Sequence, residues 1–423
     1  MRAIQLGFWT TLMLAMLAAS PHLQAQQDPG PRPGADAGGM LPNVSEDEEQ
    51  KQLFLDGLEA FNGSEGIGDG FGPRFNLDSC GGCHQQPAVG GSSPSVNPQV
   101  ALATQGGARN LVPQFISKDG PIREVRFRSD SRVHGLFVIS GRNDDTGNAS
   151  SCNIRQETFQ DQGNIIFRIP TPVFGAGLIE QISDSAILEN QNAHADVKQT
   201  LGILGKAQQD VLQDEQLDNK LGRFGWKAQH ASLRIFAGEA YNVEMGITNE
   251  LFETELEQDS NCQYAEVPNS PIPESGPPSD VDLFTAFMRG LHPPASHPNE
   301  PGGDESIARG AAAFARDQVG CALCHTPELA GVRLYSDLLL HNMGAQLADG
   351  ITQGDAEPDQ FRTAPLWGLG QRLFFLHDGR TKDLIEAIRA HRSEGSEANK
   401  VIERFDQLDA DAMQDMLNFL RSL

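Results

Sequence analysis

Apolar residues recur mostly at helical spacing along this chain. Residues 45–62 open with a capping-box pattern at Ser45 to Glu48 and predict a helix whose apolar face is formed by Leu53, Phe54, Leu58 and Phe61. The same spacing predicts helices over residues 279–288 and 307–316. A last helix follows its expected N-cap, Asp411, and places Met413, Met416, Leu417 and Leu420 in the core.

Strict alternation of apolar and polar residues is scarce. Only residues 122–128 and 133–140 resemble short strands, and 44 Gly and 25 Pro residues interrupt much of the remainder. We therefore expect a mainly α fold with long loops and minor β-hairpins.

The first 25 residues match a cleavable signal peptide. Arg2 precedes an apolar run over residues 4–19. Residues 23–25, which end in Ala25, fit the cleavage region of a signal peptide. Polar residues interrupt the apolar run, which is shorter than the ~20 residues that span a bilayer. We expect export to the periplasm, without a stable membrane anchor.

Composition changes after the expected cleavage point. Residues 26–45 are rich in Gly, Pro, Ala and Asp without periodicity and predict a disordered leader. A second punctuated stretch, residues 268–278, is rich in Pro and marks a domain boundary. We therefore place an N-terminal domain over residues 46–275 and a C-terminal domain over residues 276–423.

The two parts look like diverged copies of one plan. Residues 57–61 (GLEAF) precede one CxxCH motif, and residues 310–314 (GAAAF) precede another. Downstream, residues 167–175 (FRIPTPVFG) parallel residues 361–368 (FRTAPLWG). Each half therefore contains a helix, a CxxCH motif and an FR…P…G segment in the same order.

The formal net charge is −25. Such an acidic chain is a poor partner for nucleic acid or anionic lipid, and it favours encounter with a basic protein or a cation. Solubility alone also explains the charge, and we favour that interpretation. Of six cysteines, the two outside the CxxCH motifs, Cys152 and Cys262, are expected to form a disulfide in an oxidising compartment; the alternative is two free buried thiols.

A CxxCH motif supplies two cysteines for thioether bonds to a haem, followed by a histidine for its iron. Zinc or thioredoxin-like chemistry would need a second nearby CxxC pair or a βαβ context, and neither is evident. We expect two covalently bound haem c groups in two cytochrome c-like domains, attached at Cys80, Cys83 and His84 and at Cys321, Cys324 and His325.

The second axial ligand decides whether a haem only transfers electrons or also binds a small molecule. For the second haem the candidates are Met343 and His391. Met343 follows His325 by only eighteen residues, whereas His391 lies just before the closing helix, and imidazole binds iron strongly. We favour His391.

For the first haem the candidates are less distinctive. His134 can coordinate the iron, line the pocket or lie at the surface, and Met245 is at helical spacing within an apolar segment that favours core packing. Glu180 follows the first FR…P…G segment and can relay protons as a catalytic group, or it can be an ordinary helix charge. Trp226 can carry electrons between the haems, or simply pack in the core.

These residues resemble the bacterial di-haem oxidoreductase family, which is similar to the di-haem cytochrome c peroxidases. The resemblance covers residues from about Leu53 to Leu423, and its most specific stretches are residues 71–84, 86–92, 222–228, 245–249, 321–327, 335–344 and 376–380.

The resemblance implies roles for several histidines. In the peroxidases a distal methionine follows a His-Asp/Ser-Gly segment by fourteen residues, and here His391 stands fourteen residues after His377. A bis-histidine second haem is thus implied, with His341 and His377 as pocket residues. No histidine follows the first CxxCH motif closely, which departs from the peroxidases. A calcium ion between the haems is common in them, but no ligand set for it is evident here.

Our leading hypothesis is an oxidoreductase in which the C-terminal haem accepts electrons from a small redox protein. Peroxide or a similar oxidant is then reduced at the N-terminal haem. The alternatives are a pure electron-transfer cytochrome with both irons six-coordinate, and an enzyme that oxidatively modifies a partner protein.

Overall fold

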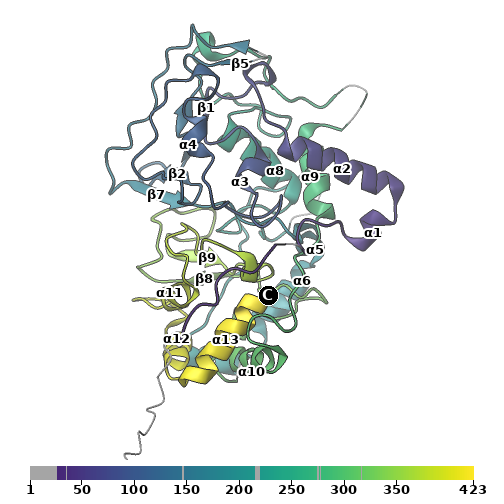
Figure 1. Cartoon of the computed structure of the whole chain (residues 1–423), viewed down its shortest axis with the longest axis vertical. Helices are drawn as coiled ribbons and strands as arrows, with labels where there is room; N and C mark the ends of the chain where they lie inside the picture. Colours follow the sequence, from purple (N-terminus) through teal and green to yellow (C-terminus); the bar gives the residue numbers. More distant parts are fainter. Residues whose placement is uncertain are drawn as a thin grey trace, which may run out of the picture.

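The computed structural model of the chain describes residues 26–34, 36–144, 147–214, 220–273, 276, 278–315 and 317–423 (Figure 1). The expected signal peptide, residues 1–25, lies outside these ranges. Helices make up most of the regular structure, and the strands form small antiparallel sheets, so the mainly α prediction is confirmed. None of the helices in the described ranges has the length and apolar character needed to cross a membrane.

A helix pair forms the core of the first half. Helix α2 (Glu48–Asn62) packs on α9 (Asp280–Gly290), and aromatic rings fill the contact between them. The two helices approach closely at Gly57, where a Cβ atom would lie 2.3 Å from the Leu283 carbonyl oxygen. Glycine is therefore required at this crossing, because any larger side chain would displace backbone.

The second half repeats this arrangement. Helix α10 (Asp304–Phe314) packs on α13 (Ala410–Ser422), and the two ribbons run side by side in Figure 1. A Cβ atom at Gly310 would lie 2.0 Å from the Asp415 carbonyl oxygen. Gly57 and Gly310 open the GLEAF and GAAAF segments, so the internal repeat has a structural counterpart.

The packing of α9 bears on the expected domain boundary, which stays a prediction. Helix α9 was assigned to a C-terminal domain over residues 276–423, but its apolar face belongs to the first core, with Phe284 and Phe287 against Phe61. In the first half α9 packs on α2, just as α13 packs on α10 in the second half. In its packing α9 goes with the first half, because its apolar face is buried in the first core.

Helix caps differ from the expectations at two ends. Asp47, rather than Ser45, caps α2 by accepting hydrogen bonds from the Glu49 and Gln50 amides. Asp409, rather than Asp411, caps α13. Ser279, where the sequence predicts a helix to begin, caps α9 by accepting a hydrogen bond from the Asp282 amide. An N-cap must have extended backbone, and the tertiary path of the chain decides which residue has it.

The largest sheet has three strands, with β2 (Glu124–Phe127) between β3 (Val133–His134) and β7 (Ile165–Arg168). The strand expected over residues 133–140 does not stay in one sheet. After Gly135 the chain leaves this sheet, and β4 (Phe137–Val138) pairs with β1 (Arg74–Phe75) instead.

Further short elements complete the fold. β5 (Asn143–Asp144) pairs with β6 (Gly147–Asn148), and β8 (Leu340–Asn342) pairs with β9 (Gln360–Arg362). The other α-helices are α1 (Pro42–Ser45), α3 (Cys80–Cys83), α4 (Gln99–Leu102), α5 (Ala176–Gln181), α6 (Asp184–Asn192), α7 (Ala195–Leu201), α8 (Leu233–Met245), α11 (Leu384–Arg389) and α12 (Asn399–Asp406). Single 3₁₀ turns are Ile67–Asp69, Gln105–Gly107, Ser260–Cys262, Cys321–Leu323 and Leu369–Gln371.

The two FR…P…G segments also correspond in space. Each begins in a strand that ends at its arginine, Arg168 in β7 and Arg362 in β9. Each ends at a glycine with positive φ, Gly175 at +65° and Gly368 at +71°, which starts a short helix. Both turns need a residue with left-handed backbone conformation, which glycine adopts without strain.

The expected disordered leader is ordered: its start lies against the second half, and residues 37–44 pack on the first half. The carboxylate of Asp28 pairs with the buried guanidinium of Arg421 at 2.6 Å and also accepts a hydrogen bond from the Leu384 amide. The Arg32 side chain donates to the Arg421 carbonyl. Residues 42–45 form α1. Composition predicted disorder because the partners of these polar groups lie almost 400 residues away.

The remaining cysteine pair behaves as expected. Cys152 and Cys262 form a disulfide with their Cα atoms 4.7 Å apart, and both residues are buried. It joins segments 110 residues apart within the first half. A crosslink over such a long loop restricts the unfolded chain strongly.

Candidate cofactor sites

The CxxCH motif of the second half opens onto a large cavity, which we call the C-terminal cavity. Its empty volume is about 1380 Å³ including the open mouth, and Cys321, Cys324 and His325 line it. The rest of its wall is mostly apolar, contributed by Phe314, Leu366, Leu376, Leu384, Ile388 and Met416 among others. Size, apolar lining and the three motif residues together suit a haem.

Two histidines face this cavity with the same hydrogen-bond arrangement. His325 Nδ1 lies 3.0 Å from the Tyr335 carbonyl oxygen, and His391 Nδ1 lies 2.8 Å from that of Ala387. A carbonyl can only accept, so Nδ1 carries the proton and Nε2 keeps its lone pair for a metal. Burial lowers the pKa of both imidazoles, that of His325 to about 4, which keeps them in the neutral form that binds iron.

Met343, the other candidate axial ligand, lines the same cavity. The structure therefore brings both candidates to one site, and the choice of His391 stays a prediction. The preference rests on the free Nε2 lone pair, since imidazole is a stronger iron ligand than a thioether.

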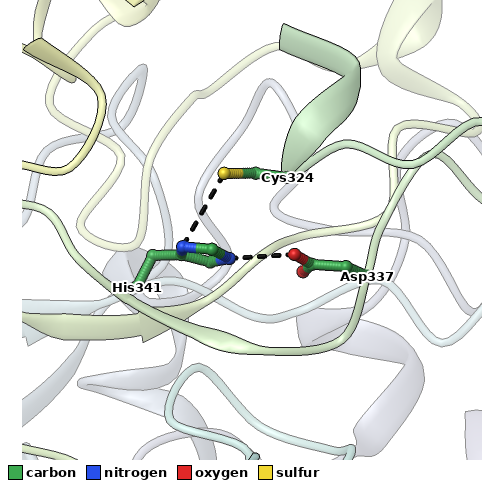
Figure 2. A group of neighbouring side chains, drawn as sticks. All are labelled: Cys324, Asp337 and His341. Atoms are coloured by element: carbon green, nitrogen blue, oxygen red, sulfur yellow. Dashed lines mark hydrogen bonds and ion pairs between the residues drawn. The ribbon is translucent and has the colours of Figure 1, made fainter. Parts of the chain in front are cut away.

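His341 stands between two carboxylates at the wall of this cavity, and Figure 2 shows it with one of them, Asp337. Its Nε2 lies 2.9 Å from an Asp337 oxygen, and its Nδ1 lies 2.7 Å from a Glu397 oxygen. Burial alone would lower the pKa of His341, but Cys324 and Asp337 raise it well above its ordinary value. Each ring nitrogen of His341 faces a carboxylate oxygen, which can only accept, so both nitrogens are engaged and neither is free for a metal.

Figure 2 also shows Cys324 beside this histidine, with its sulfur 3.7 Å from Nδ1. In the described part of the chain, potential ligand atoms of Cys324, Asp337 and His341 lie within 4.8 Å of one another. A thioether bond at the CxxCH motif would use the same sulfur, so the group fits a charged support for a haem better than a separate metal site.

The CxxCH motif of the first half forms a helical turn, α3, capped by Ser79. Its two middle residues are glycines because both sides are crowded. A Cβ atom at Gly81 would meet the Asn62 side chain at 2.2 Å, and one at Gly82 would meet Leu77 at 2.4 Å. The motif is therefore packed directly on the end of α2.

The first motif has the same chemistry as the second. His84 Nδ1 lies 3.0 Å from the Gly91 carbonyl oxygen, which leaves Nε2 for a metal, and burial lowers the pKa of His84 to about 4. Burial also raises the pKa of Cys80 to about 12 and that of Cys83 well above its usual value. Neutral sulfurs in a buried setting fit thioether bonds.

His134 and Met245 lie in different surroundings. His134 Nε2 is 3.0 Å from both Asp130 oxygens, and its ring packs on Phe127 at the wall of a separate polar cavity, which no residue of the first CxxCH motif lines. Met245 is buried at the end of α8, in the core that also contains Cys80 and Cys83. Which residue, if either, ligates the first haem stays a prediction.

Glu180 has structural partners for both of its oxygens. One accepts a hydrogen bond from the Leu233 amide at the start of α8, at 2.8 Å, and the other pairs with Arg289 Nε at 2.6 Å. These contacts join α5, α8 and α9 and account for its burial. A proton-relay role for Glu180 stays a prediction.

Trp226 lies between the C-terminal cavity and a smaller one, here called the junction cavity, and it lines both. Residues of both halves line the junction cavity, and they include Thr171, whose backbone forms a hydrogen bond with His84. Trp226 Nε1 donates to the Ile169 carbonyl, and its ring meets His377 edge-on at 6.3 Å. His377 and Trp226 are thus neighbours at the contact between the halves.

Two arginines at this contact were missed at the level of sequence. Arg362 and Arg372 line both cavities, and burial lowers the pKa of each to about 10. Within the described ranges, Arg362 Nη1 is buried without a hydrogen-bond partner. Such an orphaned donor at a cavity wall fits an anionic group, such as the carboxylates at a haem edge. The position of Arg362 in the repeated FR…P…G segment is the sequence feature that could have identified it.

A family model described as "Di-haem oxidoreductase, putative peroxidase" matches residues 130–423. No curated protein matches the chain. A solved MauG-like protein associated with microbial copper homeostasis aligns at 19% identity over 48% of this chain and 69% of that chain, with a TM-score of 0.31. Hydrazine synthase of Kuenenia stuttgartiensis, under xenon pressure, aligns at 17% identity over 34% of this chain, with a TM-score of 0.25; the match spans 55% of that chain.

Proposed function

Since the chain belongs to the family of di-haem oxidoreductases, we propose that it is a periplasmic c-type cytochrome with two covalently bound haems that reduces peroxide or a similar small oxidant. In this proposal a small redox protein delivers electrons to the C-terminal haem, and the oxidant is reduced at the N-terminal haem. The observation that supports it best is the position of Trp226, which lines both the C-terminal cavity, where the second CxxCH motif lies, and the junction cavity beside it.

The residues present fit two haems. Thioether bonds would form at the buried sulfurs of each motif, and the motif histidines would each offer Nε2 to an iron. His391 would complete the coordination at the second site. Haem supplies the electron transfer and the reduction of the oxidant when it is bound.

The chain supplies charge and geometry. Arg362 and Arg372 place two buried cations at the contact between the sites, where they would offset haem carboxylates. The Trp226 ring belongs to the first half and lines both cavities. Its Nε1 donates a hydrogen bond to the Ile169 carbonyl, which holds the ring in one orientation. An aromatic ring in this position shortens the path that an electron must cross between the sites.

Reduction of peroxide also consumes protons. We retain Glu180 and His134 as candidate catalytic groups for this step, although each has an ionic partner, Arg289 and Asp130 respectively. The Glu180 carboxylate would have to exchange its Arg289 contact to accept a proton. That requirement makes a neutralising variant, Glu180→Gln, the direct test of the relay.

One observation favours the electron-carrier alternative. Met245 is buried in the first core, against which Cys80 and Cys83 pack, so its thioether remains a candidate ligand for the first iron. With both irons six-coordinate, the protein would transfer electrons without binding peroxide. Oxidative modification of a partner protein is the third candidate class.

The deciding experiment is optical and EPR spectroscopy of the purified holoprotein, oxidised and half-reduced, before and after hydrogen peroxide is added. A high-spin ferric signal that disappears with peroxide is expected. Two low-spin haems that do not react with peroxide would replace the peroxidase proposal with the electron carrier. Mass spectrometry of the mature chain from the periplasmic fraction tests cleavage before Gln26 and covalent attachment of two haems.

A further inference from the structure

A buried ammonium group joins the two halves of the chain directly beside Trp226. The Lys227 side chain is fully buried, although it carries a charge that normally seeks water. Its Nζ donates to three backbone carbonyl oxygens at 2.8, 2.9 and 3.3 Å, those of Glu357, Gln360 and Pro358. An Asp349 oxygen lies 3.3 Å from the same atom.

The carboxylate in this cage is itself buried and shared. The second Asp349 oxygen pairs with Arg168 Nη2 at 2.7 Å, and Arg168 Nη1 donates to Gln353 at 2.6 Å. Lys227 Nζ also lies 4.2 Å from the centre of the Phe361 ring, which stacks on His377. Among the described residues, the partners of the ammonium are therefore oxygen atoms and one ring face, as a desolvated cation requires.

The cage connects segments that are far apart in the chain. Lys227 belongs to the first half, whereas residues 349–360 belong to the second. Arg362, also in the second half, binds the two residues before Lys227. Its backbone amide donates to the Trp226 carbonyl at 2.9 Å, and its Nε donates to the Gly225 carbonyl at 3.0 Å. Residues 225–227 are thus fixed to one loop of the second half.

We propose that Lys227 is a positioning residue whose ammonium serves as a built-in cation, filling an oxygen cage between the two halves and holding Trp226 between the C-terminal cavity and the junction cavity. An all-oxygen cage of this kind is the setting in which proteins bind a hard metal ion. Here the cation is part of the chain, so this junction needs no calcium. The consequence for electron transfer rests on the proposed function, whereas the cage itself does not.

The first test uses Lys227→Met in the full holoprotein, because methionine keeps the length of the side chain and removes the charge. Lys206→Met is the matched control: its Nζ donates to the Asp355 carbonyl of the same loop, but at the surface. Hydrogen exchange measured by mass spectrometry should rise at least tenfold in residues 225–228 and 349–362 of Lys227→Met alone. Unchanged exchange there in a folded variant would overturn the proposal.

The second test measures electron equilibration between the haems of the half-reduced protein after a light pulse. Lys227→Met should slow it at least tenfold, and Lys206→Met should leave it unchanged. This readout needs no peroxide turnover, so it separates failure of the positioning role from failure of the peroxidase proposal. An unchanged rate in Lys227→Met would show that the lysine is only structural.

A third measurement covers the case in which Lys227→Met does not fold. Lys227→Ala is expressed and refolded with and without methylammonium or calcium, and recovery of holoprotein by either cation is expected. No recovery would contradict the built-in cation. Stoichiometric calcium in the wild-type protein by elemental analysis, together with slower electron equilibration after chelation, would also contradict it.

Discussion

At the residue scale, hydrogen bonds decide what each imidazole can do. His325 and His391 give their Nδ1 protons to backbone carbonyls and keep Nε2 as a ligand, whereas His341 lies between Asp337 and Glu397 and has neither nitrogen free. The three side chains line one cavity, but only the first two are suited to an iron. The choice between ligand and support thus follows from the partner of each ring nitrogen.

Replacement of His391 tests this assignment. His391→Met should keep a six-coordinate second haem but raise its reduction potential, because methionine favours the reduced iron relative to imidazole. Redox titration followed optically measures the change. Met343→Leu is the control and should leave the potential nearly unchanged; a large shift there, with none in His391→Met, would make Met343 the ligand.

Glu65 predicts a pH dependence of stability. Burial raises its pKa from 4.5 to about 7, although Tyr241 donates a hydrogen bond to it. Between these values only the folded state holds the proton, so stability should fall as the pH rises from 4.5 to 7. The expected loss is ~1–2 kcal/mol, after allowance for partial exposure.

Urea unfolding of the holoprotein across this pH range measures the effect. Glu65→Gln should flatten the dependence, and the exposed Glu59→Gln should not. If the free energy of unfolding of Glu65→Gln falls as steeply with pH as that of the wild type, other groups cause the pH dependence.

At the scale of the elements, the helix pairs are set by close approach at glycine. Gly57 lets α2 reach α9, and Gly310 lets α10 reach α13, with backbone oxygens at the position that a Cβ atom would occupy. The same logic shapes the first CxxCH turn, where Gly81 and Gly82 are pressed against Asn62 and Leu77. The repeated architecture therefore depends on residues that have no side chain.

Gly57→Ala separates helix propensity from packing. Alanine would stabilise an isolated helix by ~1 kcal/mol, but the clash with the Leu283 carbonyl should cost more, for a net loss of about 1–2 kcal/mol. Thermal unfolding of the holoprotein checks the sign. Gly39→Ala, at a site with open space, is the control and should change the melting temperature little. A stabilised Gly57→Ala would mean that α2 and α9 separate without cost.

At the scale of the whole molecule, long-range ionic contacts hold the parts together. Lys227 and Asp349 join the two halves, while Asp28 and Arg421 attach the leader to the last helix. Both contacts are buried, so the loss of one partner leaves an uncompensated charge.

Asp28→Asn tests the anchoring of the leader. Removal of this carboxylate leaves the buried Arg421 without its ion pair and should reduce the free energy of unfolding by about 3 kcal/mol. Thermal unfolding, with limited proteolysis of the N-terminus, measures it. Asp36→Asn, at an exposed carboxylate of the same leader, should behave like the wild type; equal melting of all three proteins would show that the leader is not held by this contact.

Local patterns determined the chemistry and the main elements. The CxxCH motifs contain both cysteines and the histidine within five residues, so they indicate haem without any knowledge of the fold. Apolar spacing located α2, α9 and α13, and the oxidising compartment implied the Cys152–Cys262 disulfide. Each of these inferences depends on neighbours in the chain or on cysteine chemistry.

The tertiary structure alone decided which groups meet. It moved α9 into the first core, ordered the leader on Arg421, and brought Arg362 to both cavities. It also placed Lys227 among carbonyl oxygens about 130 residues away. Backbone carbonyls are the same in every sequence, so no pattern of residue types could have predicted that cage; only the folded path of the chain puts those oxygens around one ammonium group.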